Sequence, residues 1–400
     1  MNKNTSPIYY KKTPEKDRFL HRLNIKPSEE TMLLAARKQV RKAIREAFHQ
    51  ARNYLSQQVA EDELENIQNI KPKFFTQGSF AYRTLNAPCQ PGQEIDLDDG
   101  VYLPMSVVNG SPTLANQFMF DVVDGALKAL AKSQGWVFSK KATCSRVILS
   151  DRAHIDVPLY AIPDDRYREL VALNASARSW TLNESVMDSY TSLESRKLTR
   201  LDEDQVWLAI RGAEWRASDP MAISDWFHDE VVTKGERLRR LCRYLKAWRD
   251  NTWPSGGPSS IALMICAADA YPVLKDRERD DYALLEVVKK LSDSIREVTN
   301  PTTRGDDQQL EVVYPRGQEN LEEVIREVNT LKSKLTDTID GAGSPDESVM
   351  LMQELFGDRV PDRPDWIEPV RDSESRVEQI RNTPALSITD NVIPSNVRSG

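Results

Sequence analysis

The stretch 76-TQGSFAYRTLNAPCQPGQEIDLDDGVYLP-104 joins a Gly-Ser pair to a segment in which acidic and aliphatic residues alternate. Successive side chains of a β-strand point to opposite faces of the sheet. In a strand, Glu94, Asp96 and Asp98 share one face, and Asp99 lies on the other. We therefore expect the aliphatic residues to pack into a domain core and the three carboxylates to open onto a cleft.

A second predicted strand, at residues 153–160, places Asp156 between two aliphatic residues, with His154 on the same face. Carboxylates that converge from neighbouring strands repel one another unless a cation lies between them, and Mg²⁺ takes oxygen ligands of this kind, shared with phosphate. The pattern predicts a metal site of Asp96, Asp98 and Asp156, and two such ions can bracket a phosphoryl group. A solvated acidic edge strand is the alternative, and His154 either tunes the site or is an ordinary structural histidine.

The Gly78-Ser79 pair upstream favours the metal site. Glycine lets the backbone approach a ligand closely, and backbone N–H groups with a serine hydroxyl suit a phosphate. A calcium loop of the EF-hand type starting at Asp96 fails, because its sixth position is Val101 and its twelfth is Val107. The chain also has no GxxxxGK[ST], no GxGxxG followed by an acid and no GxSxG. These absences argue against a P-loop NTPase, a dinucleotide site and a nucleophile elbow.

The composition indicates a globular protein long enough for two ordinary domains, with 400 residues, 40% of them apolar and 29% charged. A formal net charge of −7 argues against a general nucleic-acid binder but leaves room for a local basic groove. No signal segment begins the chain, and the longest apolar run, at residues 261–268, is far short of a membrane span. Four scattered cysteines argue against a disulfide framework and indicate a reducing compartment, the cytoplasm: Cys89, Cys144, Cys242 and Cys266.

The order of predicted elements mixes strands with helices in the first half and becomes helical after about residue 218. This order indicates an α/β or α+β domain followed by a helical one, with a boundary near residues 215–235. Apolar spacing predicts helices at 28–56, 114–134, 218–231, 234–250, 258–271, 282–297 and 319–335. Strands are predicted within 74–104 and at 143–150 and 153–160. Residues 359–400, rich in Pro, Ser, Asn and Asp, are predicted to be a flexible tail.

These motifs resemble a known superfamily. A Gly-Ser pair, an acid–aliphatic–acid strand and a distant third acid are the pattern of the minimal nucleotidyltransferases. Within that superfamily, blocks of this chain closely resemble the bacterial cyclic GMP-AMP synthases, which are CD-NTases of anti-phage CBASS systems and relatives of animal cGAS. The blocks are 76-TQGSFAYRTLN-86, 91-PGQEIDLDDGVYLPM-105, 154-HIDVPLYAIP-163 and 242-CRYLKAWRD-250 with 256-GGPSSIALM-264. The gap between the Gly-Ser pair and the first aspartate is longer than the general pattern and suits this subgroup.

The resemblance implies an α+β fold with a polymerase-β-like mixed-sheet lobe over residues 1–225, a helical lobe over 226–358 and the tail over 359–400. It implies condensation of ATP and GTP into 3′,3′-linked cyclic GMP-AMP, with release of two pyrophosphates, as a second messenger in anti-phage defence. Two Mg²⁺ ions are the implied cofactor, with Mn²⁺ as an alternative, and neither nucleic acid nor a membrane is required. A templateless RNA nucleotidyltransferase of the poly(A) or CCA-adding type, and a non-catalytic partner that keeps the fold, remain alternatives.

Residue by residue, the resemblance implies that Asp96, Asp98 and Asp156 bind the metal, with Asp156 also helping to deprotonate the attacking 3′-OH. An acid in the loop 305-GDD-307 is implied to contact a base, and Asp307 is as well placed there as Asp306. The full set of candidate nucleotide-binding residues is Gln77, Gly78, Ser79, Tyr82, Arg146, Ser218, Lys246, Ser259, Ser260 and Asp306.

Other features carry a structural explanation beside the functional one. The serines at 259 and 260 either face an anion at a helix start or simply cap that helix. Arg239, Arg243 and Lys246 align on one helix as a solvated face or as a clamp for triphosphates. A second basic stripe, on the first long helix, either binds an anionic ligand or, as we predict, is a solvated face; it comprises Arg37, Arg41 and Arg45.

The chain ends in 395-SNVRSG-400. In type II CBASS systems the synthase is coupled through its C-terminal glycine to a target by a ubiquitin-like E1/E2 enzyme. The resemblance therefore implies conjugation through Gly400, and an effector that the cyclic dinucleotide activates.

Overall fold

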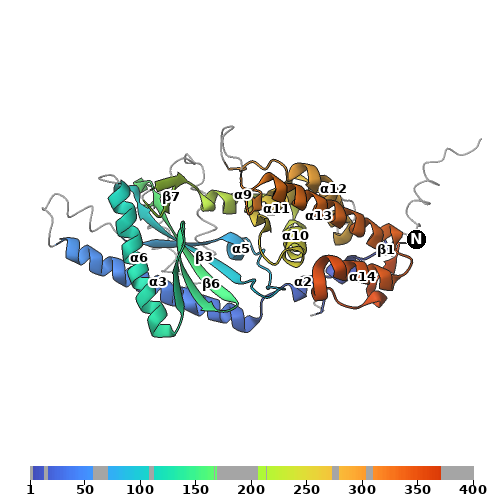
Figure 1. The fold of residues 1–400 in the computed structure, drawn as a ribbon, viewed down its shortest axis with the longest axis horizontal. Coiled ribbons are helices and arrows are strands. Elements are labelled where there is room, and N and C mark those ends of the chain that lie inside the picture. The colour runs from blue at the N-terminus through green and yellow to red at the C-terminus, as the bar shows by residue number, and fades with distance from the viewer. Residues whose placement is uncertain are drawn as a thin grey trace, which may run out of the picture.

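The computed structural model describes residues 3–12, 17–56, 71–107, 112–165, 167–168, 206–212, 214–272, 279–302 and 310–370. These residues form two lobes side by side (Figure 1). We call them the sheet lobe, which comprises α3 (Pro27–Ser56) and the elements from β2 (Lys73–Gln77) to β8 (Glu214–Ala217), and the helical lobe. The helical lobe comprises residues 3–23 and the elements from α9 (Pro220–Lys234) to β11 (Glu368–Pro369). Among the described helices, none combines the length and the apolar character needed to cross a membrane.

The sheet lobe is built on a seven-stranded mixed sheet in the order β2-β3-β6-β5-β4, with β7 pairing the end of β6 and β8 pairing β7. β3 and β6 are parallel, and the chain between them forms the helix α6 (Pro112–Gln134) and then β4 and β5. The other pairs are antiparallel. This arrangement confirms the mixed sheet that the resemblance implies. The strands are β2 (Lys73–Gln77), β3 (Ile95–Pro104), β4 (Val137–Lys140), β5 (Cys144–Ser150), β6 (Ala153–Ile162), β7 (Trp207–Ile210) and β8 (Glu214–Ala217).

The register of three adjacent strands brings the predicted acids together. In the parallel β3–β6 pair, Asp96 is opposite His154, and Asp98 is opposite Asp156. In the antiparallel β5–β6 pair, Asp156 is opposite Arg146. Since residues two apart on a strand share a face, these five side chains form two neighbouring rows on one face of the sheet.

The opposite face of the sheet is covered by α3 (Pro27–Ser56) and α6 (Figure 1), and Ile95 and Leu97 are fully buried there, as predicted. Asp99 also lies on this face, is 0% exposed and accepts hydrogen bonds from Arg41 Nε (2.7 Å) and Nη2 (2.6 Å). The prediction of a solvated arginine face on this helix is therefore wrong for Arg37 and Arg41, which are 4% and 3% exposed. Helical spacing correctly placed them on one face, but that face meets the sheet at a buried acid.

The helical lobe surrounds the amphipathic α10, whose apolar side packs into a continuous core. Its helices are α9 (Pro220–Lys234), α10 (Arg237–Thr252), α11 (Ser260–Asp269), α12 (Asp280–Ser294), α13 (Gln318–Thr336) and α14 (Pro345–Phe356), with helical turns η4 (Asp337–Gly341), η5 (Gly357–Arg359) and η6 (Pro364–Trp366). β9 (Gly257–Pro258) pairs with β10 (Val313–Tyr314). All seven predicted helices are present, with ends shifted by a few residues.

Both ends of the described chain belong to the helical lobe, which differs from the predicted domain limits. Ile8, Tyr9 and Phe19, in and beside the short α1 (Ser6–Tyr9) and α2 (Phe19–Arg22), pack into its core, so residues 3–23 are not part of the sheet lobe. β1 (Lys3–Asn4) pairs with β11 (Glu368–Pro369), and Val360 is buried. The predicted flexible tail is therefore wrong for residues 359–370, while residues 371–400, with Gly400, lie outside the described part of the chain.

Candidate active site

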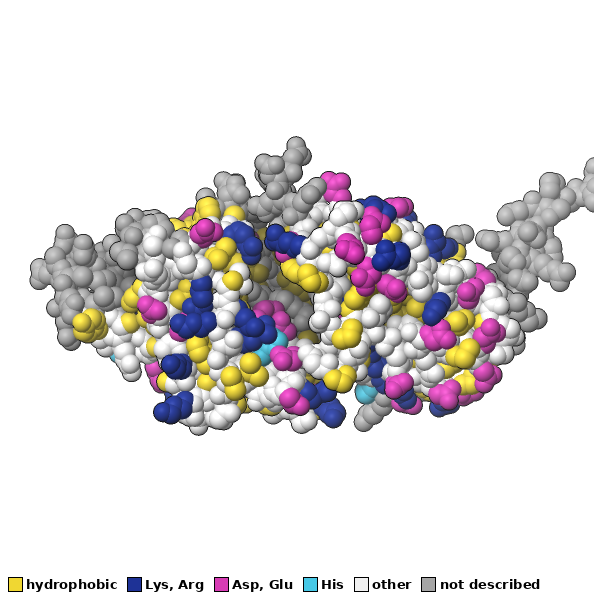
Figure 2. All heavy atoms as spheres, in the orientation of Figure 1, with side chains coloured by type: hydrophobic (Ala, Val, Ile, Leu, Met, Phe, Trp, Pro, Cys, Tyr) yellow, Lys and Arg dark blue, Asp and Glu magenta, His cyan; other side chains and the backbone are white. Residues whose placement is uncertain are grey.

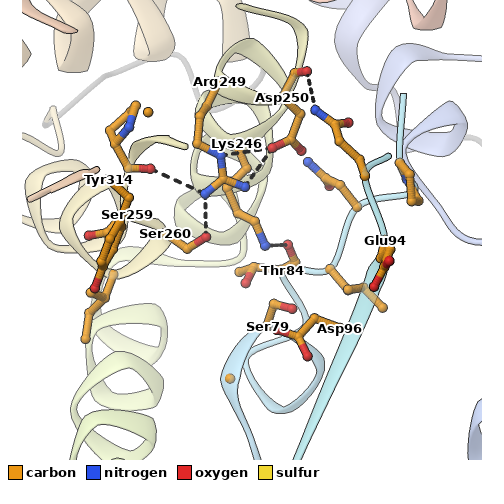
Figure 3. Close-up of a pocket in the computed structure, with 18 of the residues that line it drawn as sticks. Ser79, Thr84, Glu94, Asp96, Lys246, Arg249, Asp250, Ser259, Ser260 and Tyr314 are labelled. Carbon is orange, nitrogen blue, oxygen red and sulfur yellow. Dashed lines mark hydrogen bonds and ion pairs between the residues drawn. The ribbon is translucent and has the colours of Figure 1, made fainter. Parts of the chain in front are cut away.

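A cleft of about 830 Å³ lies between the two lobes. Acidic, basic and histidine side chains gather at the hollow between the lobes (Figure 2). From the sheet lobe, the cleft is lined by Gly78, Ser79, Tyr82, Thr84, Glu94, Asp96, Asp98 and Arg146. From the helical lobe, it is lined by Lys246, Arg249, Asp250, Trp253, Ser259, Ser260 and Tyr314, several of which face the acids in Figure 3.

The acidic side of the cleft concentrates negative charge. Burial, and then the charges of Asp96 and Asp156, raise the pKa of Asp98 well above its ordinary value. One oxygen of Asp96, Oδ1, is buried without a hydrogen-bond partner. Ligand atoms of Asp96, His154 and Asp156 all lie within 4.8 Å of one another. Two clustered carboxylates with a histidine nitrogen beside them can hold a divalent cation, so Asp96 and Asp156 fit the predicted metal site, whereas Asp98 is not among the ligand atoms of this group.

Arg146 fixes the third acid of the set. Its Nε and Nη2 donate to Oδ1 and Oδ2 of Asp156, both at 2.6 Å, as the strand register requires. A bidentate pair of this kind sets the plane of the carboxylate. Each oxygen of Asp156 keeps a second lone pair for another partner. Arg146 therefore positions Asp156 without preventing it from binding a cation.

His154 lies next to Asp96, with Nε2 2.9 Å from Asp96 Oδ1, and its Nδ1 contacts Glu94. Although burial disfavours the imidazolium, the adjacent Asp96 raises the pKa of His154 above its ordinary value. Glu94, which we expected on the face of the metal ligands, thus contacts His154, and His154 in turn contacts Asp96.

Gly78 follows β2 and begins the short helix α5 (Gly78–Ala81) with a positive φ of 67°. A Cβ at this position would lie 2.2 Å from Asp98 Oδ2. The space that we predicted for a ligand is therefore taken by the Asp98 carboxylate. Only glycine satisfies both the backbone angle and this close approach.

Replacing Gly78 by alanine is expected to reduce the catalytic rate by up to about 10²-fold. The Asp98 carboxylate would have to move away from the new Cβ, and a displacement of about 1 Å in an active site can lower the rate by this factor. Steady-state rates of nucleotide consumption measure this effect. Gly92→Ala is the matched control, since Gly92 also has a positive φ (85°) but has nothing within 4 Å of the point where a Cβ would lie. Equal losses in the two variants would attribute the effect to backbone strain alone.

Three of the candidate nucleotide-binding residues are not placed in the cleft. The Gln77 side chain is buried between two tyrosines, donating to Tyr160 OH (3.0 Å) and accepting from Tyr102 OH (3.2 Å), so it supports the sheet. Ser218 follows the last residue of β8 and lies outside the set of described residues that line the cleft. Asp306, like its neighbour Asp307, falls outside the described residues. The candidates that line the cleft are Gly78, Ser79, Tyr82, Arg146, Lys246, Ser259 and Ser260.

The helical side of the cleft is cationic and preformed. Lys246 is buried and donates from Nζ to Thr84 O (2.8 Å), and burial, followed by the charge of Arg249, lowers its pKa to about 8. Arg249, which sequence reasoning missed although it follows Lys246 by three residues, donates to Ser260 Oγ (2.7 Å; Figure 3). Ser259 caps α11 by accepting from Ala262 N at 3.2 Å, so the capping explanation holds for this serine.

The predicted basic stripe on α10 is divided between two cavities. Lys246 faces the catalytic cleft, whereas Arg239 and Arg243 line a second cavity of about 1080 Å³. Burial lowers the pKa of Arg243 to about 10, and its Nε donates to Asn86 Oδ1 (2.9 Å). Arg37 also borders this second cavity, whose charge suits an anionic ligand.

Comparison with known proteins agrees with this geometry. Residues 72–160 match the model of the cyclic GMP-AMP synthase DncV-like nucleotidyltransferase domain, and residues 235–368 match that of the cyclic GMP-AMP synthase C-terminal domain. The chain is 37% identical to a cyclic GMP-AMP synthase of Escherichia coli (strain TW11681), over 73% of this chain and 68% of that protein. It is 34% identical to that of Vibrio cholerae, over 75% and 70%.

Solved structures give the same result. The Vibrio cholerae DncV cyclic AMP-GMP synthase in complex with the linear intermediate 5′ pppA(3′,5′)pG superimposes with a TM-score of 0.77 at 28% identity, over 93% of this chain and all of that one. The same enzyme in complex with GTP and 5MTHFGLU2 gives a TM-score of 0.77 over 93% of this chain. With sequence relatives at 34–37% identity over about three quarters of its length, the chain belongs to the DncV-like cyclic GMP-AMP synthases, a family of nucleotidyltransferases.

Proposed function

We propose that the protein condenses ATP and GTP into 3′,3′-linked cyclic GMP-AMP and releases two pyrophosphates. The observation that carries this proposal is the row Asp98–Asp156–Arg146, aligned by strand register and facing Lys246 and Arg249 across one cleft. Acids on one wall and cations on the other suit a triphosphate whose charge must be neutralised while its α-phosphate reacts. A relative has been solved in complex with the linear intermediate 5′ pppA(3′,5′)pG, which supports a reaction that passes through a linear dinucleotide.

Asp96, Asp98 and Asp156 would hold the divalent cations, two Mg²⁺ with Mn²⁺ as an alternative. When bound, these ions neutralise charge on the phosphates and lower the pKa of a coordinated hydroxyl.

The chain's own residues orient the reactants. Lys246 and Arg249 bind phosphate oxygens from the helical side, and Ser79 with the backbone of α5 binds them from the sheet side. Asp156, held by Arg146, accepts the proton of the 3′-OH as this oxygen attacks the α-phosphorus and pyrophosphate leaves. The linear dinucleotide then reverses its orientation in the cleft, so that a second attack with the same groups closes the ring.

The product distinguishes this function from its alternatives. Purified protein incubated with labelled ATP, GTP and Mg²⁺, with and without an RNA primer, is expected to form a phosphatase-resistant dinucleotide, identified by chromatography and mass spectrometry, without the primer. Extension of the primer would instead identify a templateless RNA nucleotidyltransferase. Absence of pyrophosphate release would indicate a partner that keeps the fold without catalysis.

We further propose that the product acts as a second messenger in anti-phage defence in the cytoplasm, where ATP and GTP are available, by activating an effector. Gly400 lies outside the described residues, and we propose that an E1/E2-like enzyme conjugates the chain through it, as the resemblance to the CBASS synthases implies.

A further inference from the structure

His154 lies within the acidic cluster and has no role in the reaction described above. It is 5% exposed and lies on β6, opposite Asp96 of β3. Its Nδ1 contacts Glu94, and its Nε2 is 2.9 Å from Asp96 Oδ1. Both atoms are buried, and their contact is an ion pair that leaves neither atom a second polar partner among the described residues. A cation between Nε2 and Oδ1 would give each of these buried atoms a further partner.

The contact with Glu94 determines which nitrogen is available. An imidazole that donates its Nδ1 proton to a carboxylate keeps the lone pair on Nε2. Histidines that bind metals almost always donate their other ring N–H to a carboxylate or carbonyl in this way, which fixes both the tautomer and the ring orientation. Glu94, His154 and Asp96 therefore form the series carboxylate, imidazole and metal-binding carboxylate.

The distances also suit a shared cation. Neighbouring ligands of a six-coordinate ion with bonds of about 2.0–2.1 Å lie about 3 Å apart. The separation between His154 Nε2 and Asp96 Oδ1, 2.9 Å, matches that value, and a ligand atom of Asp156 is within 4.8 Å of both.

We propose that His154 is a metal ligand, with Nε2 joining Asp96 and Asp156 around one of the divalent cations. The inference rests on the cation site of the proposed function but not on the identity of the product. A nitrogen ligand distinguishes this position from an all-oxygen magnesium site, because imidazole favours first-row transition ions whereas Mg²⁺ prefers oxygen. One position of the site is accordingly expected to prefer Mn²⁺ to Mg²⁺.

Binding of Mn²⁺ to the nucleotide-free protein, at pH 8 where protons compete less for the imidazole, tests the proposal without any turnover. Electron spin-echo modulation of bound Mn²⁺ is expected to show coupling to ¹⁴N in the natural protein. In His154→Asn this coupling disappears and the Kd for Mn²⁺ rises by about tenfold or more, whereas the Kd for Mg²⁺, from competition, changes less. The matched control is His228→Asn, since His228 lines the second cavity.

A second experiment needs no variant and therefore applies even where His154→Asn does not fold. All four histidines of the natural protein are labelled with ¹⁵N, and a histidine ligand then replaces the ¹⁴N coupling with a ¹⁵N coupling. Mn²⁺ binding without nitrogen coupling would overturn the proposal and leave His154 as a residue that only positions Asp96. A protein that shows the coupling but makes no cyclic dinucleotide would overturn the proposed function and keep this inference. No Mn²⁺ binding at all would overturn this inference, while the proposed function is decided separately by product formation with Mg²⁺.

Discussion

Asp98→Asn is expected to reduce cyclic dinucleotide synthesis by at least about 10³-fold while making the cation-free protein more stable. The loss of activity follows because a neutral amide neither neutralises nor holds a divalent cation, whose contribution of several kcal/mol corresponds to rate factors of this size. The assay is product formation from ATP and GTP over a range of Mg²⁺ concentrations. If the variant retains the rate of the natural protein, Asp98 is not a ligand of the catalytic metal.

The gain in stability follows from the raised pKa of Asp98, which burial, Asp96 and Asp156 produce. The folded protein holds this proton more tightly than the unfolded chain, so stability is lost as the pH rises from the unfolded value of about 3.9 through the folded pKa. At neutral pH Asp98 is ionised in the unfolded chain at no cost, so burial of this group among other acids opposes folding, and burial of the neutral amide does not. Without metal, the Tm of Asp98→Asn is expected to exceed that of the natural protein. Added Mg²⁺ is expected to raise the Tm of the natural protein more than it raises the Tm of Asp98→Asn.

Thermal unfolding in EDTA and in Mg²⁺ measures both effects. Asp151→Asn is the matched control, because Asp151 is an exposed aspartate in the turn between β5 and β6. It is expected to leave both Tm and activity unchanged. A lower Tm for Asp98→Asn in EDTA would show that the acidic cluster is not strained without its cation.

The acids of the site could be predicted from the sequence because the signal is local. Alternation within β3 fixes which face carries Asp96 and Asp98, and it holds whatever the strand pairs with. The pairing of Asp156 with Arg146 and the contact of His154 with Asp96 depend on the register between strands, which a single sequence does not specify.

Other errors have identifiable physical causes. Helical periodicity placed Arg37 and Arg41 on one face but could not reveal that Asp99 is buried opposite them. The α14 helix was overlooked although its local signal was present, since Ser344 caps it by accepting from Glu347 N (3.1 Å) in a Ser-x-x-Glu motif. The short β7 and β8 could not be predicted, because β7 gains its partners only from β6, far along the chain, and from β8.

Arg41→Met is expected to reduce the free energy of unfolding by about 3–5 kcal/mol, because it removes the guanidinium that binds both oxygens of the buried Asp99 carboxylate. Thr76 Oγ1, which donates to Asp99 Oδ1 at 2.9 Å, cannot replace a bidentate guanidinium. Total stabilities are about 5–15 kcal/mol, so the loss is a large fraction of the whole. Urea unfolding followed by circular dichroism measures it.

Two further variants separate charge from packing. Arg45→Met removes the same side chain one turn later on α3, where Arg45 is exposed and stacks on Phe74 at 4.8 Å, and should change the free energy by only about 0.5–1 kcal/mol. If the unpaired carboxylate causes the loss in Arg41→Met, adding Asp99→Leu removes that carboxylate and is expected to restore much of the stability, since apolar residues replace buried ion pairs at little cost. A double variant less stable than Arg41→Met would show that shape, and not charge, holds α3 against the catalytic sheet.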